Sequence, residues 1–569
     1  MDLEDLKQQV ARAIHARDGI DPELILKGFE APREREHGDI ALPCFILSRR
    51  LKKNPAAIAA DYAIHLSAVI PAPATVAAVG PYLNFHLPAA FKARDILAAV
   101  TAGGDRYGSD AAGTGRTVVI DFSAPNIAKP FGLGHLRSTV IGNALAAIHV
   151  FQGWRVVRVN HLGDWGKQFG LLDVAFARWG SEAALLADPI RHLYELYVRI
   201  NREVEGGDTV LDEEGRQAFR DLEQGDAARR ARWARFRELS IREFKRVYER
   251  LDIAFDSYDG EAFFEDKMDA TLARLRDKNL LVTSEGAQVV DLSDEGLGYP
   301  IIQKTNGSTT YLTRDLATAE YRHATYGFDR MLYVVGQPQE LHFKQVFAIL
   351  RRMGYGWVDR CAHVAFGYIK GMSTRKGTIV FLDDVLDEAR ERVKRRMQAL
   401  AVQKVAAADE EAVAEAIGIT AVLFSDMKSR RIKDIEFDWD RLLNLQGDTG
   451  PYLQNALARI CGIFRKAEVA PAGDDAAWDC LEDPHAQALI AAVAAFPAAV
   501  AESERLNEPS LITSHLLGLA KSFHAGYNEL KVKGSDEATA RARLRLFAAV
   551  ERVFRTGFGL LGFKVLEEM

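Results

Sequence analysis

The sequence predicts an α/β protein built around a doubly wound, Rossmann-type parallel sheet with a helical insertion. An N-terminal α/β domain is appended before this sheet and a C-terminal all-α helical bundle follows it. In the central part of the chain, short apolar strands at 117–120, 154–159 and 331–335 alternate with helical stretches, as in parallel sheets. From about 380 onward Ala, Leu, Arg and Glu recur with helical periodicity, and strand patterns are almost absent, which favours a helical bundle.

The chain has 569 residues, too many for a single hydrophobic core, so roughly three or four domains are expected. Gly-rich clusters at 103–105 and 113–115 mark the first boundary. A one-sided apolar pattern, with residues 233, 236, 244, 247 and 251 at helical spacing, marks the insertion. We expect an appended domain at 1–112, the parallel-sheet domain at 113–380 with its insertion at about 170–255, a helical connecting region at 381–446, and a helical domain at 447–569.

Composition indicates a folded protein, with 48% hydrophobic and 27% charged residues. The start Met-Asp-Leu-Glu-Asp lacks a basic apolar leader, and no stretch has the ~20 apolar residues that span a bilayer, so we expect a cytoplasmic protein without a membrane partner. The 4 cysteines form no C-x-x-C pair, so neither a disulfide framework nor a metal site is predicted. A net charge of -6 excludes no nucleic-acid partner, because binding needs only a local basic face.

The loop after the first predicted strand suits phosphate chemistry. It carries two prolines, the glycines Gly132 and Gly134, and leads into the N-terminus of a helix, where unpaired N–H groups favour an anion. Lys129 and His135 add side-chain donors that could stabilise negative charge on a phosphate under attack by a carboxylate. Taken alone, Gly-Leu-Gly-His fits a strand-to-helix turn with a capping histidine equally well.

Three strings along the chain carry a family resemblance. Ser-Ala-Pro-Asn-Ile-Ala-Lys-Pro-Phe-Gly-Leu-Gly-His-Leu-Arg-Ser-Thr at 123–139 resembles the first signature motif of class I aminoacyl-tRNA synthetases, in the form typical of the arginine-specific family. The string Asn-His-Leu-Gly-Asp-Trp-Gly-Lys-Gln-Phe-Gly at 160–170 is similar to the next block of that family. Lys-Gly-Met-Ser-Thr-Arg-Lys-Gly at 370–377 occupies the place of the second signature motif. The resemblance covers essentially the whole chain and is weakest in the insertion.

The chain departs from both signature motifs. Gly132 stands where the first histidine is usual, and Gly371 and Thr374 replace the two lysines of the second motif. The resemblance implies that Lys129 supplies the missing positive charge, since a phosphate can be neutralised from either side at similar distance. It also implies the catalytic residues Lys129, His135, Lys370, Arg375 and Lys376, with ATP bound by Lys129, Gly132, Gly134, His135, Met372 and Ser373.

An arginine pocket must surround a permanent planar cation with carboxylates and aligned acceptors, and an aromatic face adds to the binding. Tyr311 and Asp315 stand four apart and would share one face of a helix. Gln339 follows a predicted strand, where doubly wound sheets bind ligands. The resemblance implies that arginine is bound by Asn126, Glu261, Tyr311, Asp315 and Gln339, and leaves open which carboxylate takes the guanidinium.

The segment 447–459 resembles the start of the family's anticodon-binding bundle, with Asn455 at a position that is commonly aromatic. The resemblance implies tRNA contacts from Tyr82, Asn84, His342, Tyr452, Asn455, Arg459, Tyr527 and Met569. For Tyr82, packing in the core of its own domain is an equal alternative. The basic run at 428–433 fits either a phosphate contact or a solvated helix face.

The resemblance implies an enzyme that uses ATP to form arginyl-adenylate and then transfers the arginine to tRNA(Arg). Mg²⁺ would accompany ATP without a dedicated protein site, tRNA would be needed before the first step, and a monomer is expected. Two alternatives remain. One is an adenylyltransferase that activates a carboxylate without tRNA. The other is a tRNA-binding paralogue without activity, which Gly132 favours.

Overall fold

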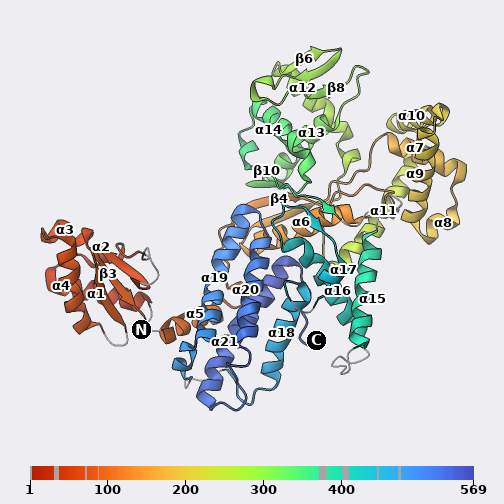
Figure 1. Ribbon diagram of the computed structural model, residues 1–569. Helices are drawn as coiled ribbons and strands as arrows, with labels where there is room; N and C mark the ends of the chain where they lie inside the picture. The colour runs from red at the N-terminus through yellow and green to blue at the C-terminus, as the bar shows by residue number, and fades with distance from the viewer. Residues whose placement is uncertain are drawn as a thin grey trace. The chain divides into compact units, whose positions relative to one another are not determined.

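The structure is a computed structural model that describes residues 3–569 except 31, 33–36, 71–73, 88, 371–380, 400–408, 445–446 and 472–475. It divides into two compact units. The first contains residues 1–107, 462–495 and 521–553, and the second contains 108–461, 496–520 and 554–569. The colours of Figure 1 follow the chain through both units.

The N-terminal part of the first unit is an α/β domain with a 3-stranded antiparallel sheet in the order β1-β3-β2, which confirms the predicted class of this domain. Asn54 begins α4 by accepting hydrogen bonds from two backbone N–H groups, and Pro55 takes the first helical position. The elements are α1 (Leu3–Asp18), α2 (Pro22–Leu26), β1 (Ile40–Pro43), α3 (Phe45–Leu51), α4 (Pro55–Val69), β2 (Thr75–Val79) and β3 (Tyr82–His86).

The remainder of the first unit is helical. Phe523 and Phe547 pack edge to face there, with ring centroids 5.9 Å apart. Its elements are α5 (Ala89–Gly103), η2 (Gly104–Arg106) and η7 (Trp478–Glu482), together with parts of α18 (Gly450–Arg465), α19 (Pro484–Leu506), α20 (Ser510–Gly526) and α21 (Glu537–Leu561).

A 4-stranded parallel sheet in the order β10-β9-β4-β5 forms the centre of the second unit. Val118, Val119 and Ile120 on β4 are fully buried, as expected for a strand covered on both faces. The crossover helices α6 and α14 make the parallel connections, which confirms the predicted sheet and its three predicted strands. The elements are β4 (Thr117–Asp121), α6 (Leu133–Phe151), β5 (Arg155–Val159), β9 (Arg330–Tyr333), η5 (Gln337–Gln339), α14 (Glu340–Arg352), η6 (Gly356–Arg360) and β10 (Cys361–His363).

A second sheet, which the sequence analysis did not predict, lies between β5 and β9 in the chain. It has 3 antiparallel strands in the order β6-β7-β8. Glu285 and Gly286 form the turn between its first two strands, both with positive φ, as in the tight turns of β-hairpins. The elements are η3 (Glu261–Lys267), α12 (Met268–Asp277), β6 (Leu281–Ser284), β7 (Ala287–Val290), η4 (Ser293–Glu295), β8 (Ile301–Gln303) and α13 (Tyr311–Tyr326).

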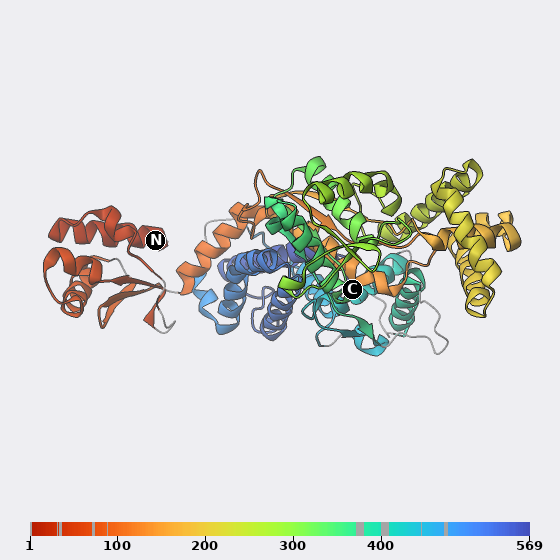
Figure 2. The ribbon, with the colours of Figure 1, turned by 90° about the horizontal axis from the view of Figure 1, so that it is seen from above.

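The predicted insertion is helical, and its helices α7–α10 form the yellow lobe of Figures 1 and 2. Helix α11 leads from this lobe to the parallel sheet. It buries Phe236, Phe244 and Val247 on one face, as the apolar pattern predicts, while Trp233 is half-buried. The elements are α7 (Lys167–Trp179), α8 (Glu182–Ala187), α9 (Pro189–Glu205), α10 (Thr209–Glu223) and α11 (Ala227–Arg250).

The last third is helical, as predicted, apart from a strand of 2 residues, β12, that pairs in parallel with β11. Helix α19 is long and apolar enough to cross a membrane by length and composition. Its side chains Leu489, Val493, Phe496 and Val500 are fully buried within the protein, as in a core helix. The elements not yet named are β11 (Ile369–Lys370), α15 (Leu382–Gln398), α16 (Glu410–Met427), β12 (Ile435–Glu436) and α17 (Trp439–Leu442).

Candidate active site at the carboxyl ends of the parallel strands

The loop between β4 and α6 has a strained backbone. Ser123, Ala124 and Ala128 all have positive φ, at 75°, 48° and 57°, and each such residue costs about 1–3 kcal/mol unless its surroundings hold it. Neighbouring side chains supply that restraint by accepting hydrogen bonds from the N–H groups of these three residues: Ser138 Oγ at 2.9 Å, Asn160 Oδ1 at 3.1 Å and Ser240 Oγ at 2.9 Å. The first signature loop is therefore held in one shape by residues from three other segments.

Gly132 is the N-cap of α6, and its N–H donates to His135 Nδ1 at 3.3 Å. Burial lowers the pKa of His135 to about 4, and the charge of Lys129 acts in the same direction. The ring is therefore neutral near pH 7, and because Nδ1 accepts, the proton is on Nε2, which makes His135 a neutral donor. Among the described residues, no atom lies within 4 Å of a side chain placed at Gly134, so there is space beside the first turn of α6, where helices favour anions.

Lys129 lies half-buried in the same loop, with its Nζ 4.5 Å from the centre of the Tyr197 ring on α9. A cation over an aromatic face is stabilised without losing its charge. Lys129 therefore brings a positive charge to the loop, next to the neutral donor His135.

Four residues predicted from the second signature motif lie outside the described residues: Met372, Ser373, Arg375 and Lys376. The described residues on either side are fixed. Lys370, before the segment, pairs with Asp434 at 2.6 Å, and this hydrogen bond raises the pKa of the lysine. Phe381, after the segment, forms an antiparallel bridge with Gly132, and the N–H of Leu382 donates to the Phe131 carbonyl at 2.8 Å. Phe381 and Leu382, which follow the second motif in the chain, therefore lie beside the first motif.

Two predicted carboxylates lie beyond the carboxyl end of β5. Glu261 begins η3, its N–H donates to the Leu162 carbonyl at 3.0 Å, and its Oε2 is 3.4 Å from Nη1 of Arg314. Burial raises the pKa of Glu261 to about 7, although the charge of Arg314 opposes that shift and Asp315 adds to it. Asp315 Oδ2 is 2.5 Å from His342 Nε2. Glu261 and Asp315 are thus electrostatic neighbours in one acidic site.

The other residues predicted for arginine binding surround the same edge of the sheet. Tyr311 lies one turn before Asp315 on α13, as predicted, and the residue is 61% exposed. Asn126 forms a parallel bridge with Gly163, which joins the loops after β4 and β5. Gln339 is exposed at the start of α14, in the loop after β9. Three neighbouring loops therefore meet where parallel sheets bind ligands.

Asp164 holds this acidic site together, although the sequence analysis did not single it out. It is 1% exposed and accepts from Arg237 Nε at 2.8 Å and from the N–H of Ala262 at 2.9 Å, directly after Glu261. A side chain at Gly260 would meet Asp164 Oδ1 at 2.6 Å, so only glycine fits there. The sequence could have pointed to this residue, because the string at 160–170 carries Asp164 just after a buried strand.

Arg314 was also not predicted. Its guanidinium pairs with Glu261 and lies over the Tyr311 ring, with Cζ 5.5 Å from the ring centre. A guanidinium of the protein itself therefore contacts the carboxylate and the aromatic ring that were predicted for substrate arginine. The chemistry of these two side chains suits a guanidinium.

The residues predicted to contact tRNA occupy several places. Tyr452, Asn455 and Arg459 lie on one face of α18, where Arg459 is exposed, and all three are in the second unit. Gln454 on the same helix donates to the Lys564 carbonyl at 2.9 Å, so the C-terminal segment that ends at Met569 begins beside α18.

The other residues predicted to contact tRNA lie in the acidic site or in the first unit. His342 lies beside Asp315 in the acidic site. Tyr82 is half-buried and packs edge to face on Phe45, with ring centroids 6.1 Å apart, while Asn84 is only 3% exposed. Tyr527 lies in the first unit, 5.7 Å from the Phe523 ring.

The basic run at 428–433 is neither a helix face nor wholly solvated. Arg137 on α6 is 1% exposed, pairs with Asp426 at 3.1 Å, and donates to the carbonyls of Arg431 and Lys433. Arg431 in turn donates to the Asn507 carbonyl at 3.0 Å. At least Arg431 therefore has a structural role.

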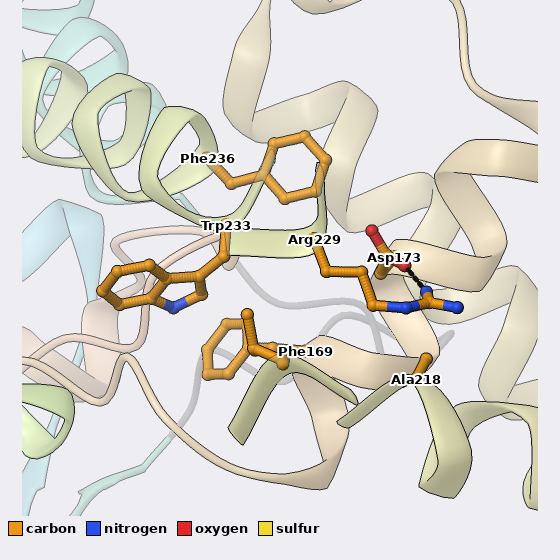
Figure 3. Close-up of a pocket in the computed structure, with 7 residues that line it drawn as sticks. Phe169, Asp173, Ala218, Arg229, Trp233 and Phe236 are labelled. Carbon is orange, nitrogen blue, oxygen red and sulfur yellow. Dashed lines mark hydrogen bonds and ion pairs between the residues drawn. The ribbon is translucent and has the colours of Figure 1, made fainter. Parts of the chain in front are cut away.

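A small cavity lies in the insertion, and Figure 3 shows its lining residues, among them Phe169, Trp233 and Phe236. Asp173 forms an ion pair with Arg229 at its edge. Its volume of about 10 Å³ is enough for roughly one water molecule and not for a substrate. The candidate active site is therefore at the sheet edge and not in this cavity.

Comparisons with known proteins agree with this geometry. The models of three families match: tRNA synthetases class I (R), catalytic domain, over 97–439, DALR anticodon binding domain over 453–569, and Arginyl tRNA synthetase N terminal domain over 4–87.

Curated relatives match along nearly their whole length. An arginine–tRNA ligase of Exiguobacterium sibiricum is 44% identical over 99% of this chain and 100% of its own length. One of Streptococcus equi is 44% identical over 96% of this chain and 97% of its own.

Solved structures of arginyl-tRNA synthetases share the fold. The Thermus thermophilus protein has a TM-score of 0.73 and 24% identity, and the alignment covers 100% of both chains. The Plasmodium falciparum protein has a TM-score of 0.73 and 22% identity over 100% of this chain and 99% of its own. With the first signature loop and the acidic site at one edge of a parallel sheet, and with relatives that match from end to end, the chain belongs to the arginine–tRNA ligase family of class I aminoacyl-tRNA synthetases.

Proposed function

We propose that this protein ligates L-arginine to tRNA(Arg) at the expense of ATP, through an arginyl-adenylate. The observation that carries the proposal is the meeting of two sites at one sheet edge. A loop with Lys129 and a neutral His135 lies after β4, and the carboxylates Glu261 and Asp315 lie beyond β5. The first arrangement suits a polyphosphate and the second suits a cationic amino acid.

In the first step, the carboxylate of arginine attacks the α-phosphate of ATP, and pyrophosphate leaves. Negative charge increases on the phosphate oxygens in the transition state, where Lys129 supplies positive charge and His135 donates from Nε2. The first turn of α6 at Gly134 offers backbone N–H groups to the same oxygens, while the N–H of Gly132 donates to His135 Nδ1. Lys370, Arg375 and Lys376 would act from the second motif. Mg²⁺ enters with ATP, whose phosphates are its principal ligands.

Arginine recognition depends on charge and on hydrogen-bond geometry. We propose that Glu261 and Asp315 bind the cationic groups of the substrate, with Tyr311 against the side chain and with Asn126 and Gln339 at the reacting end. When the substrate guanidinium arrives at Glu261, the contact of 3.4 Å between that carboxylate and Arg314 is exchanged or shared. A substrate without a cationic side chain would leave the acidic site unpaired, which is costly and gives selectivity.

In the second step, a hydroxyl of the terminal adenosine of the tRNA attacks the carbonyl of arginyl-adenylate, an ester bond forms, and AMP leaves as the acyl-phosphate bond breaks. We propose that Tyr452, Asn455 and Arg459 on α18, with Met569 and Tyr527, contact the anticodon loop, and that Tyr82, Asn84 and His342 contact other parts of the tRNA. Stacked bases and phosphate contacts are the usual means of such binding. We further propose domain limits at 1–112, 113–380, 381–446 and 447–569, and a cytoplasmic monomer.

Aminoacylation tests this function directly. Mixed tRNA is incubated with the protein, ATP, Mg²⁺ and each amino acid in turn. The expected result is charging with arginine alone and arginine-dependent pyrophosphate exchange that requires tRNA. Exchange that proceeds without tRNA and without charging would indicate an adenylyltransferase. Tight tRNA binding with neither activity would indicate a non-catalytic paralogue.

A further inference from the structure

Helix α11 of the insertion contacts the first signature loop through a buried serine. Ser240 is 0% exposed, its Oγ accepts from the N–H of Ala128 at 2.9 Å, and its hydroxyl donates to the Phe236 carbonyl at 2.7 Å. Ala128 has a φ of 57° and directly precedes Lys129. A residue outside both signature motifs therefore fixes the strained peptide next to the lysine.

Two turns further along α11, Tyr248 holds the other strained part of the loop. It is 1% exposed, its hydroxyl is 2.7 Å from Ser123 Oγ, and it accepts from Asn160 Nδ2 at 2.9 Å. The same Asn160 accepts from the N–H of Ala124 at 3.1 Å. Ser240 and Tyr248 thus act, directly or through Asn160, on all three loop residues with positive φ.

Tyr248 also supports the histidine. Its ring packs edge to face on Phe131, with centroids 5.3 Å apart, and Phe131 stacks on His135 at 5.6 Å with an interplanar angle of 9°. One buried tyrosine is therefore connected both to the loop that carries Lys129 and to the ring that donates to phosphate.

We propose that Ser240 and Tyr248 are positioning residues for adenylate formation, acting through Lys129 and His135. The inference rests on the proposed function for the roles of those two residues. Without the Ser240 hydroxyl, the peptide at Ala128 loses its acceptor, and without the Tyr248 hydroxyl, Asn160 loses the partner that orients it toward the N–H of Ala124. Both peptides can then relax toward negative φ. The donors then shift relative to the α-phosphate, and a displacement of about 1 Å can reduce a rate roughly 100-fold.

The test uses the full-length variants Tyr248→Phe and Ser240→Ala, each of which removes a single oxygen. The measurement is tRNA-dependent, arginine-dependent pyrophosphate exchange, with tRNA affinity measured separately. We expect kcat to fall roughly 10- to 100-fold while the Kd for tRNA is unchanged. Matched controls are Tyr62→Phe, which removes a buried hydroxyl bound to Asp18, and Ser425→Ala, which removes a buried hydroxyl bound to the Val422 carbonyl. Both controls should change kcat by no more than about twofold.

A double-mutant cycle with Lys129→Ala separates positioning from a general structural role. If Tyr248 acts through Lys129, the factor lost in Tyr248→Phe shrinks in the Lys129→Ala background, whereas independent effects multiply. The positioning role is overturned if the effects of Tyr248→Phe and Lys129→Ala multiply. It is also overturned if Tyr248→Phe and Ser240→Ala have the same kcat as their control variants. Both conclusions hold even if Lys129→Ala is itself strongly impaired. Normal exchange by Lys129→Ala instead overturns the proposed function of the loop on which the inference rests.

Discussion

At the scale of single residues, the site depends on which groups carry charge. His135 has a pKa near 4 because it is buried, so it is neutral where Lys129 is charged. The unfolded chain would take up a proton on this histidine near pH 6.5 and the folded chain only near pH 4. Acidification through this window therefore destabilises the folded state, since the unfolded state binds more protons. At neutral pH, Lys129 is the side chain that gives the first signature loop its positive charge.

We predict that Lys129→Ala reduces arginine-dependent pyrophosphate exchange by roughly 100-fold or more, because removal of one preorganised donor at a developing charge has an effect of that size. Exchange is measured with saturating tRNA and arginine. The control is Lys278→Ala, at an exposed lysine after α12, which should retain the rate of the unaltered protein. An unchanged rate in Lys129→Ala would contradict the compensating charge.

We predict that Glu261, a proposed contact of substrate arginine, makes arginine binding depend on pH. Its pKa is about 7, so the group is mostly protonated at pH 6 and mostly ionised at pH 8. The ionised form binds a guanidinium, and we therefore predict that KM for arginine falls roughly tenfold as pH rises from 6 to 8. Glu261→Gln should raise KM and remove this dependence. A flat profile in the unaltered protein would show that another group binds the cation.

At the scale of elements, glycines decide how closely α7 and α10 pack. A side chain at Gly170 on α7 would lie 2.1 Å from the Gly215 carbonyl on α10, and one at Gly215 would lie 2.3 Å from the Leu171 side chain. The two helices therefore meet through backbone contacts that allow no larger residue. Such close packing fixes the lobe from which α11 leads to the active site.

Gly170→Ala should accordingly destabilise the protein by about 1–3 kcal/mol through overpacking. Gly518→Ala is the matched control, because Gly518 is an exposed glycine within α20 and a side chain there meets no atom within 4 Å. That change should be stabilising by about 0.5–1 kcal/mol. Thermal unfolding of both variants measures the difference, and equal melting temperatures would refute the close contact.

At the scale of the whole molecule, chemistry and tRNA binding are assigned to different surfaces. The acidic site and the first signature loop lie at the carboxyl edge of the parallel sheet, while Tyr452 and Arg459 lie on α18 in the helical last third. Substitutions that remove side chains at the two surfaces should therefore affect different kinetic constants.

We predict that Tyr452→Ala and Arg459→Ala each raise KM for tRNA by roughly 5- to 100-fold, the range for a stacking or base contact, and leave KM for arginine unchanged. Arg505→Ala, at an exposed arginine paired with Glu502, is the control. Aminoacylation kinetics with varied tRNA and varied arginine separate the two constants. An equal rise in both would mean that α18 affects the fold and not the tRNA.

The local sequence pattern was sufficient to predict the sheet, the helical last third and the first signature loop. Buried strands require runs of apolar residues, and helices with one buried face require apolar residues at helical spacing. The hairpin of β6 and β7 was missed, although Glu285 and Gly286 between apolar runs are a turn signal, because the surrounding strands are short. The contacts of Asp164 and Arg314 were missed for a different reason. Neither has a local periodicity, and each acquires its partner only through the fold.

The sequence by itself determined the class of fold and the family, and it predicted the chemical nature of the site, since these depend on side-chain types at short spacing along one chain. Tertiary structure alone decided that His135 is neutral, that Arg314 contacts Glu261, and that Ser240 and Tyr248 on the insertion hold the strained loop. The protonation state of a side chain and the restraint of a loop arise from burial and from partners more than 50 residues away in the chain. Examples of such partners are Arg314 with Glu261 and Tyr248 with Ser123. Those distances in space cannot be derived from spacing in sequence.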